Sequence, residues 1–330
     1  MSGPPRSQGF VLIMAVLSAA GAPAAAQDAP AAAVQRFEAR DYGEAIRILE
    51  PFVRQNNRSH QGAFYLGAAY LAQRDRSNAV RHLERAANLD RSNPLYSFTL
   101  AQAYMLQVQG SNPVSQLNLA RKIRNALEKT AELDPGHVEA RYALVRFHLM
   151  APGVVGGGVR AARSLAEQLG RLDRSWGHEA WADIHLEEKN EASAERELLA
   201  AMALRPERMT PWTSLANLYL RQGEPPKAME VFESLHRADP ERTLALFHIG
   251  RIASTSGVRL DRGEEALRRY LREAPADDPA ALARAHVRLG AIQERKGEAA
   301  AAARSYEEAL RLQPGSREAR ESLARLRGPA

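Results

Sequence analysis

Apolar residues in the stretch 209–242 recur at the spacing of an α-helix, and the same spacing returns after a short break. The first predicted helix carries its large apolar and small side chains on one face, at Trp212, Leu215, Ala216 and Tyr219. The second predicted helix does the same at Ala228, Phe232 and Leu235. Gly223, followed by Pro225 and Pro226, predicts the turn between them. One such hairpin cannot bury its apolar faces alone, so similar hairpins are expected on both sides.

The pattern of paired amphipathic helices continues along nearly the whole chain. The third and seventh copies are longer than the others. The extra length of the third predicts a turn-rich insertion at 109–113 or a longer second helix, and that of the seventh is assigned to 254–260. A charged helix with two inward leucines closes the series. The predicted repeats are about 27–59, 60–93, 94–137, 138–174, 175–208, 209–242, 243–282 and 283–316, followed by the closing helix at 317–327.

These repeats resemble the tetratricopeptide repeat, whose pattern sets Trp, Leu, Gly and Tyr on the first helix and Ala, Phe and Pro on the second. The stretch 209–242, ending with Pro240, is the cleanest copy. The resemblance covers residues 27–327 and implies an all-α fold. In this family the hairpins form a right-handed α-solenoid, here of about eight hairpins with a C-terminal capping helix, and the first helices line a concave groove that binds proteins or peptides.

Residues 1–26 have the pattern of a cleavable secretory signal peptide. Arg6 precedes an apolar run at 10–20, and three alanines at 24–26 form a small-residue cleavage site before Gln27. The run is too short to span a bilayer comfortably, and no second apolar stretch follows. The chain has no cysteine, which excludes a disulfide and a lipoprotein anchor. We therefore expect a soluble periplasmic or secreted protein without an integral membrane segment, resembling the exported bacterial type of tetratricopeptide-repeat protein.

The formal net charge of +6 changes this interpretation little. Between residues 27 and 173 there are 19 Lys and Arg against 14 Asp and Glu, whereas from residue 174 onward there are 25 of each. Export argues against a nucleic acid as the partner. The excess therefore indicates either attraction to acidic proteins, anionic lipids or envelope glycans, or merely a solvated arginine-rich surface, and its spread along the helices favours the second.

The glycine-rich stretch 151–158 leaves several interpretations open. Three successive glycines at 156–158 could place backbone N–H groups against an anion at the start of the next helix. No Gly-Lys-Ser/Thr motif follows and no strand precedes, so a long inter-helix turn or hinge is favoured. The apolar tip at Pro152, Val154 and Val155 could also dock a partner.

Groups that could carry catalysis are sparse. There is no thiol, no G-x-S-x-G motif and no H-E-x-x-H pair. His178 and His185 share one helix face, with Glu179 and Asp183 nearby, which would allow a metal site. Both histidines occupy positions where the other repeats place packing residues, which favours a structural role. We expect no enzyme activity, no cofactor and no metal.

The resemblance implies one specific site in the groove. In peptide-binding relatives, polar and basic residues on three successive first helices hold the free carboxylate of a partner's C-terminus. The register of the last three repeats places these clamp residues at Thr213, Asn217, His248, Arg284 and Arg288. Thr213 stands where a lysine is expected and His248 where an asparagine is expected. The alternative is that the arginines form local salt bridges on the surface.

The earlier repeats place mainly aromatic and apolar residues toward the groove. Aromatic and arginine side chains are enriched in binding hot spots, so this aromatic strip is a second candidate surface, although its rings could instead pack between adjacent helices. The aromatic strip consists of Phe64, Tyr65, Phe98, Tyr142, Arg146 and Met150.

The sequence as a whole predicts an exported, non-enzymatic scaffold that binds one or more envelope proteins or peptides in its groove. The alternative is a periplasmic small-molecule binding protein associated with a transporter, with its pocket near residues 156–158 and the aromatic strip.

Overall fold

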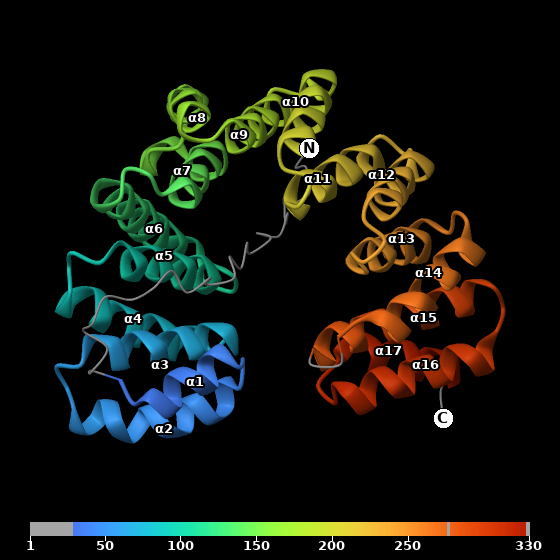
Figure 1. The fold of residues 1–330 in the computed structure, drawn as a ribbon, viewed down its shortest axis with the longest axis horizontal. Coiled ribbons are helices and arrows are strands. Elements are labelled where there is room, and N and C mark those ends of the chain that lie inside the picture. The colour runs from blue at the N-terminus through green and yellow to red at the C-terminus, as the bar shows by residue number, and fades with distance from the viewer. Residues whose placement is uncertain (1–28, 276–277, 328–330) are drawn as a thin grey trace. The chain divides into compact units, whose positions relative to one another are not determined.

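The computed structural model describes residues 29–275 and 278–327, and all regular structure within these ranges is helical. The predicted signal peptide at 1–26 lies outside the described residues. The helices are α1 (Ala31–Glu38), α2 (Tyr42–Gln55), α3 (His60–Ala72), α4 (Arg76–Leu89), α5 (Pro94–Val108), α6 (Pro113–Leu133), α7 (Val138–Met150), the short 3₁₀ helix η1 (Gly153–Val155), α8 (Val159–Leu172), α9 (Arg174–Glu187), α10 (Glu191–Leu204), α11 (Met209–Arg221), α12 (Pro225–Ala238), α13 (Leu244–Ser256), α14 (Leu260–Glu273), α15 (Pro279–Arg295), α16 (Ala299–Leu312) and α17 (Arg317–Arg327). The expected all-α solenoid of antiparallel helix hairpins is confirmed (Figure 1).

The chain forms two compact units, which we describe separately. Unit 1 contains helices α1 to α9 and unit 2 contains α10 to α17, with the boundary between Glu188 and Lys189. The boundary therefore divides the predicted repeat 175–208 between its two helices. Within each unit, helices that follow one another in the chain pack together in order.

Helix starts follow from capping residues in the sequence. The side chains of Asp41, Ser59, Asp75 and Asn112 each accept a hydrogen bond from a backbone N–H in the first turn of the helix that follows. Proline occupies an early position of α5, α6, α12 and α15, where its missing N–H has no partner to lose.

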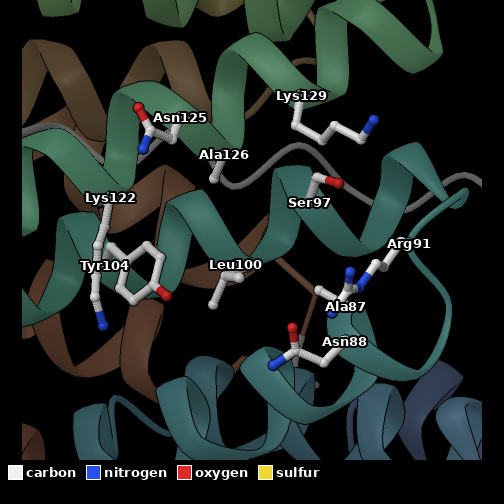
Figure 2. A pocket seen from close by; sticks show the side chains of 10 residues that line it. All are labelled: Ala87, Asn88, Arg91, Ser97, Leu100, Tyr104, Lys122, Asn125, Ala126 and Lys129. Carbon is white, nitrogen blue, oxygen red and sulfur yellow. The ribbon is translucent and has the colours of Figure 1, made fainter.

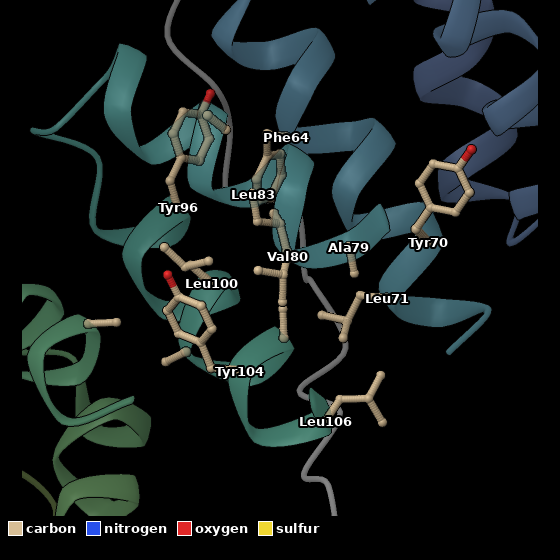
Figure 3. Packing of buried hydrophobic residues seen from close by; sticks show 14 of the residues in the cluster. Phe64, Tyr70, Leu71, Ala79, Val80, Leu83, Tyr96, Leu100, Tyr104 and Leu106 are labelled. Atoms are coloured by element: carbon tan, nitrogen blue, oxygen red, sulfur yellow. The ribbon is translucent and has the colours of Figure 1, made fainter. Parts of the chain in front are cut away.

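The core of unit 1 depends on close approach between the two helices of a hairpin. A Cβ at Gly67 in α3 would lie 2.7 Å from the Cγ atom of Leu83 in α4, so glycine permits this crossing. Leu83 is fully buried and belongs to the apolar cluster that Figure 3 shows. Tyr104 at the rim of the same cluster donates its hydroxyl proton to Glu84 on the preceding second helix at 2.6 Å. Tyr70 contacts Glu50 in the same way, so the repeat also fixes its tyrosine by a polar contact.

Unit 2 has the same architecture. A Cβ at Gly290 in α15 would lie 2.7 Å from the ring of Tyr306 in α16. The last helix, α17, packs on this hairpin through Leu323, while Arg325 on its outer side pairs with Glu294 at 3.0 Å. This combination of an apolar inner face and a charged outer face is typical of a helix that ends a solenoid.

The extra residues of the two long repeats lie at different places. In the third repeat they mainly lengthen the second helix, because α6 has 21 residues whereas α4 has 14. In the seventh repeat the assignment to 254–260 is wrong. Helix α14 begins sixteen residues after α13 begins, as α12 does after α11, and the additional residues instead let α15 begin early, at Pro279.

We expect Arg40→Gly to stabilise unit 1. Arg40 joins α1 to α2 with φ at 60°, a left-handed conformation that costs a non-glycine residue about 1 kcal/mol. Gly223 and Gly297 serve the equivalent turns of unit 2. The urea midpoint of Arg40→Gly should therefore rise, by about 0.5–1 kcal/mol in the free energy of unfolding. Arg40→Ala is the matched control, since it removes the same side chain without easing the backbone, and an equal gain there would contradict this explanation.

Candidate binding surface on the first helices

The histidine predicted for the groove, His248 in α13, is held neutral by its neighbours. Its ring stacks on Phe232 of α12 with the centroids 4.4 Å apart and the planes 8° apart. The Nε atom of Arg251 donates to Nδ1 of His248 at 3.4 Å, so Nδ1 is the unprotonated nitrogen. Burial, and then the charge of Arg251, lowers the pKa of His248 to about 3.

Arg251 itself is a cation in an unfavourable place. It lies on α13 and is partly buried, and burial lowers the pKa of its guanidinium. Helix α13 packs against α15, and the positive charge of Arg288 on α15 lowers that pKa further. Among the residues that the structure describes, no carboxylate lies within ion-pair distance of Arg251.

The two arginines predicted on α15 have different surroundings. Arg288 forms a two-pronged contact with Glu318 of α17, at 2.8 and 3.3 Å. Arg284 is exposed, one turn earlier on the same helix. We call Arg251 and Arg288 the basic cluster: two cations of unit 2, with Glu318 as the one carboxylate paired with them in the described part of the chain.

The predicted clamp positions on α11 add polar groups only. The hydroxyl of Thr213 donates to carbonyl oxygens of its own helix, that of Thr210 at 2.8 Å and that of Met209 at 3.1 Å. Asn217, one turn later, is exposed. The structure thus joins His248 to Arg251, a residue that the sequence analysis missed, and α13, which carries both, packs against the helix of Arg288. No described contact joins Thr213, Asn217 or Arg284 to that group.

Two rings of the aromatic strip belong to the core of unit 1. Phe64 is 3% exposed and stacks on Tyr96 at 4.7 Å between ring centroids. Tyr142 is also 3% exposed, and its hydroxyl donates to Asp183 of α9 at 2.8 Å. Burial and the charge of Asp183 raise the pKa of Tyr142 well above its ordinary value. These rings pack between neighbouring helices because each sits where two first helices meet.

The remaining members of the strip are more accessible. Tyr65 and Phe98 are partly exposed, and Phe98 packs against the ring of His137 at 4.6 Å. Arg146 lies 3.7 Å from Asp183 and is partly exposed, whereas Met150 is 47% exposed. The strip is therefore narrower than the sequence pattern indicates.

The glycine-rich stretch between α7 and α8 is a packed turn. Val155 is 1% exposed, and the carbonyl oxygen of the same residue accepts a hydrogen bond from Arg124 of α6 at 2.9 Å. The backbone N–H groups of residues 156–158 all donate to carbonyl oxygens within residues 148–153. No donor of this glycine run is therefore left for an anion, which removes the support for an anion cradle there. Val154 at the tip is 77% exposed.

Of the two histidines predicted on α9, His185 packs against neighbouring side chains. His185 lies against the ring of Trp181 at 5.9 Å and 3.7 Å from Glu188. No group of three or more metal-binding side chains occurs among the described residues, and none of the helices described is long and apolar enough to cross a membrane.

We expect acid to destabilise unit 2 through His248. Because the folded state holds this ring unprotonated to about pH 3, whereas the unfolded ring titrates near its ordinary pKa of 6.5, the unfolded state alone gains a proton in between. The contribution of neutral His248 to the free energy of unfolding is thus intact above pH 6.5. It is lost as the pH falls toward 3, at up to about 1.4 kcal/mol per pH unit. Urea unfolding of wild type and His248→Phe between pH 7 and 4 measures it. Equal pH slopes in the two proteins would contradict the assignment.

Comparison with known proteins gives one recurring match. Residues 209–252, which contain α11 and α12, and residues 283–316, which contain α16 and most of α15, each match a model of the tetratricopeptide repeat. A tetratricopeptide repeat protein from Parabacteroides merdae ATCC 43184 is 15% identical over 90% of this chain and 96% of its own, with a TM-score of 0.48. Yeast Tom70 is 12% identical over 90% of this chain and 86% of its own, also with a TM-score of 0.48. No curated protein matches the chain.

Proposed function

Because the chain is a tetratricopeptide-repeat protein, we propose that it is a non-enzymatic scaffold whose first helices bind the C-terminal segment of an envelope protein or peptide. Stacked hairpins of this kind present a row of first helices to a partner, and such surfaces serve protein–protein interaction. The partner's chemistry is argued from the site, since the fold alone does not determine it.

The observation that carries this proposal is the basic cluster of unit 2. Arg251 and Arg288 lie on the packed helices α13 and α15, and among the residues described Glu318 pairs with Arg288 whereas no carboxylate pairs with Arg251. A carboxylate arriving between them would form charge-assisted hydrogen bonds and relieve the repulsion of the two cations. Guanidinium groups suit this role because their planar donors match a carboxylate in pairs.

The neighbouring residues have supporting roles in this proposal. Neutral His248 holds the Nε atom of Arg251 and so leaves the Nη donors of that arginine for the ligand. Arg284 and Asn217, both exposed, would contact the peptide before its terminus. On unit 1, Tyr65, Phe98 and Arg146 would offer a separate contact surface of aromatic and basic character.

The test compares a free carboxylate with its amide. Random peptides displayed with free C-termini are selected on the mature protein, and the enriched sequences are resynthesised as acids and as C-terminal amides. The acid should bind about tenfold more tightly than the amide, and Arg251→Ala should remove this difference. Arg304→Ala, an exposed arginine on the second helix α16, is the control. Equal binding of acid and amide, or no enrichment at all, would overturn the proposal.

We further propose export through the N-terminal signal. The expected result is a mature protein that begins at Gln27 in the periplasmic fraction, detected by intact mass and N-terminal sequencing. Arg6→Glu together with a charged residue at Leu12 should retain the full-length chain in the cytoplasm, because the signal needs its positive start and apolar run. Recovery of the uncleaved wild-type chain from the cytoplasm would contradict this assignment.

A further inference from the structure

Unit 1 contains a groove that is separate from the first-helix surface. It lies between the second helices α4 and α6, with α5 as its floor, and has a volume of about 320 Å³. Figure 2 shows Leu100 of α5 between Ala87 of α4 and Ala126 of α6. The walls carry small side chains, the floor residue Leu100 is 9% exposed, and the phenol ring of Tyr104 lines one end.

A small residue lines one end of the groove. Ser97 stands three positions before Leu100, as Trp212 of α11 stands three positions before Leu215 in the cleanest repeat. The Trp212 side chain is 8% exposed, and its indole N–H donates to the carbonyl oxygen of Pro206, six residues earlier, at 3.0 Å. Ser97 places a much smaller side chain at the equivalent position of α5, where it lines the groove.

The rim of the groove is basic. Lys122 at the Tyr104 end is 2.9 Å from Glu84, and Lys129 is 3.2 Å from Glu132. Arg91 and Lys129 lie on either side of Ser97 (Figure 2), and no carboxylate within the described ranges pairs with Arg91. The amide side chains of Asn88 and Asn125 complete the lining. Three cations against two carboxylates leave the groove with a net positive charge.

We propose that this groove binds a small organic anion with an apolar body. The anionic group lies between Arg91 and Lys129, where two cations offer charge-assisted hydrogen bonds. The apolar body lies over Leu100 between the two alanines and extends toward the ring of Tyr104. This division into a few polar groups at one end and an apolar floor is typical of small-ligand sites.

The test uses anilinonaphthalenesulfonate, an aromatic anion, and N-phenylnaphthylamine, which has the same rings without the sulfonate. Fluorescence titration of the mature protein should show the anion binding at least about tenfold more tightly than the neutral compound. Ser97→Trp should abolish the binding of the anion, since the indole fills the groove and can donate to the carbonyl oxygen of Arg91 as Trp212 does to Pro206.

A charge variant keeps the proposal testable if Ser97→Trp does not fold. Arg91→Ala combined with Lys129→Ala should weaken the anion about tenfold and leave the neutral compound unchanged. Arg121→Ala removes an exposed cation from α6 outside the groove and should change neither. Unchanged binding of the anion by folded Ser97→Trp, equal affinity for the two compounds, or displacement of the anion by an equal concentration of inorganic phosphate would overturn the proposal.

Discussion

Gly157→Ala should destabilise unit 1 by about 3 kcal/mol, because the new methyl group has no space. A Cβ at this position overlaps the carbonyl oxygen of Ala151, which belongs to the backbone and cannot rotate away. The turn cannot shift to make room, since Arg124 of α6 and His148 of α7 hold the carbonyl oxygens of Val155 and Gly156. The urea midpoint of unit 1 should fall accordingly.

Gly153→Ala is the matched control for this prediction. Gly153 lies four residues earlier in the same turn, and a Cβ there meets no atom within 4 Å. The substitution should change the free energy of unfolding by less than about 0.5 kcal/mol. Similar losses in the two variants would show that the turn needs glycine for flexibility, as a hinge would, and not for the close approach to Ala151.

The helices could be predicted from the sequence because local signals and apolar spacing agree. Capping residues such as Asp75 and Asn112 coincide with the start of an apolar period, and glycine or proline marks most turns. The length of α6 could not be assigned in the same way. A polar stretch such as 109–117 is compatible with a loop or with an exposed helical turn, and only packing against neighbouring helices decides between them.

The site was predictable to the level of the repeat register and no further. The register places His248, Arg284 and Arg288 on first helices, as the structure does. The register does not predict the contact between Glu318 of α17 and Arg288, because that contact depends on the packing of a helix outside the repeat pattern. Arg251 follows His248 by three residues on the same helix, and this spacing is the signal that could have identified it.

For the aromatic strip, the sequence pattern predicted surface residues of which two belong to the core. In a sequence pattern, aromatic residues on an inward face are equally compatible with a binding surface and with an interface between helices. The structure assigns Phe64 and Tyr142 to the interface, where their partners Tyr96 and Asp183 belong to the following first helices. These partners are more than thirty residues away along the chain, so their proximity depends on how successive hairpins stack.

The second large effect is expected at Phe232. Its side chain is fully buried in α12, so Phe232→Ala should cost about 3–5 kcal/mol in the free energy of unfolding. The conservative Phe232→Leu keeps most of the apolar volume and should cost under about 1.5 kcal/mol. Urea unfolding of unit 2 measures both, and a loss as large for leucine as for alanine would contradict a requirement for volume.

Phe232→Leu also tests how the basic cluster is maintained. The stacked ring of Phe232 contributes to the burial that keeps the pKa of His248 near 3, so without it that pKa should rise toward 6.5. NMR titration of the histidine ring measures this change directly. Once protonated, His248 can no longer accept the hydrogen bond from Arg251 and adds a third positive charge beside Arg251 and Arg288. The binding of a peptide carboxylate should then become stronger as the pH falls below the raised pKa, whereas the wild-type protein, whose His248 stays neutral, should show no such increase over the same range.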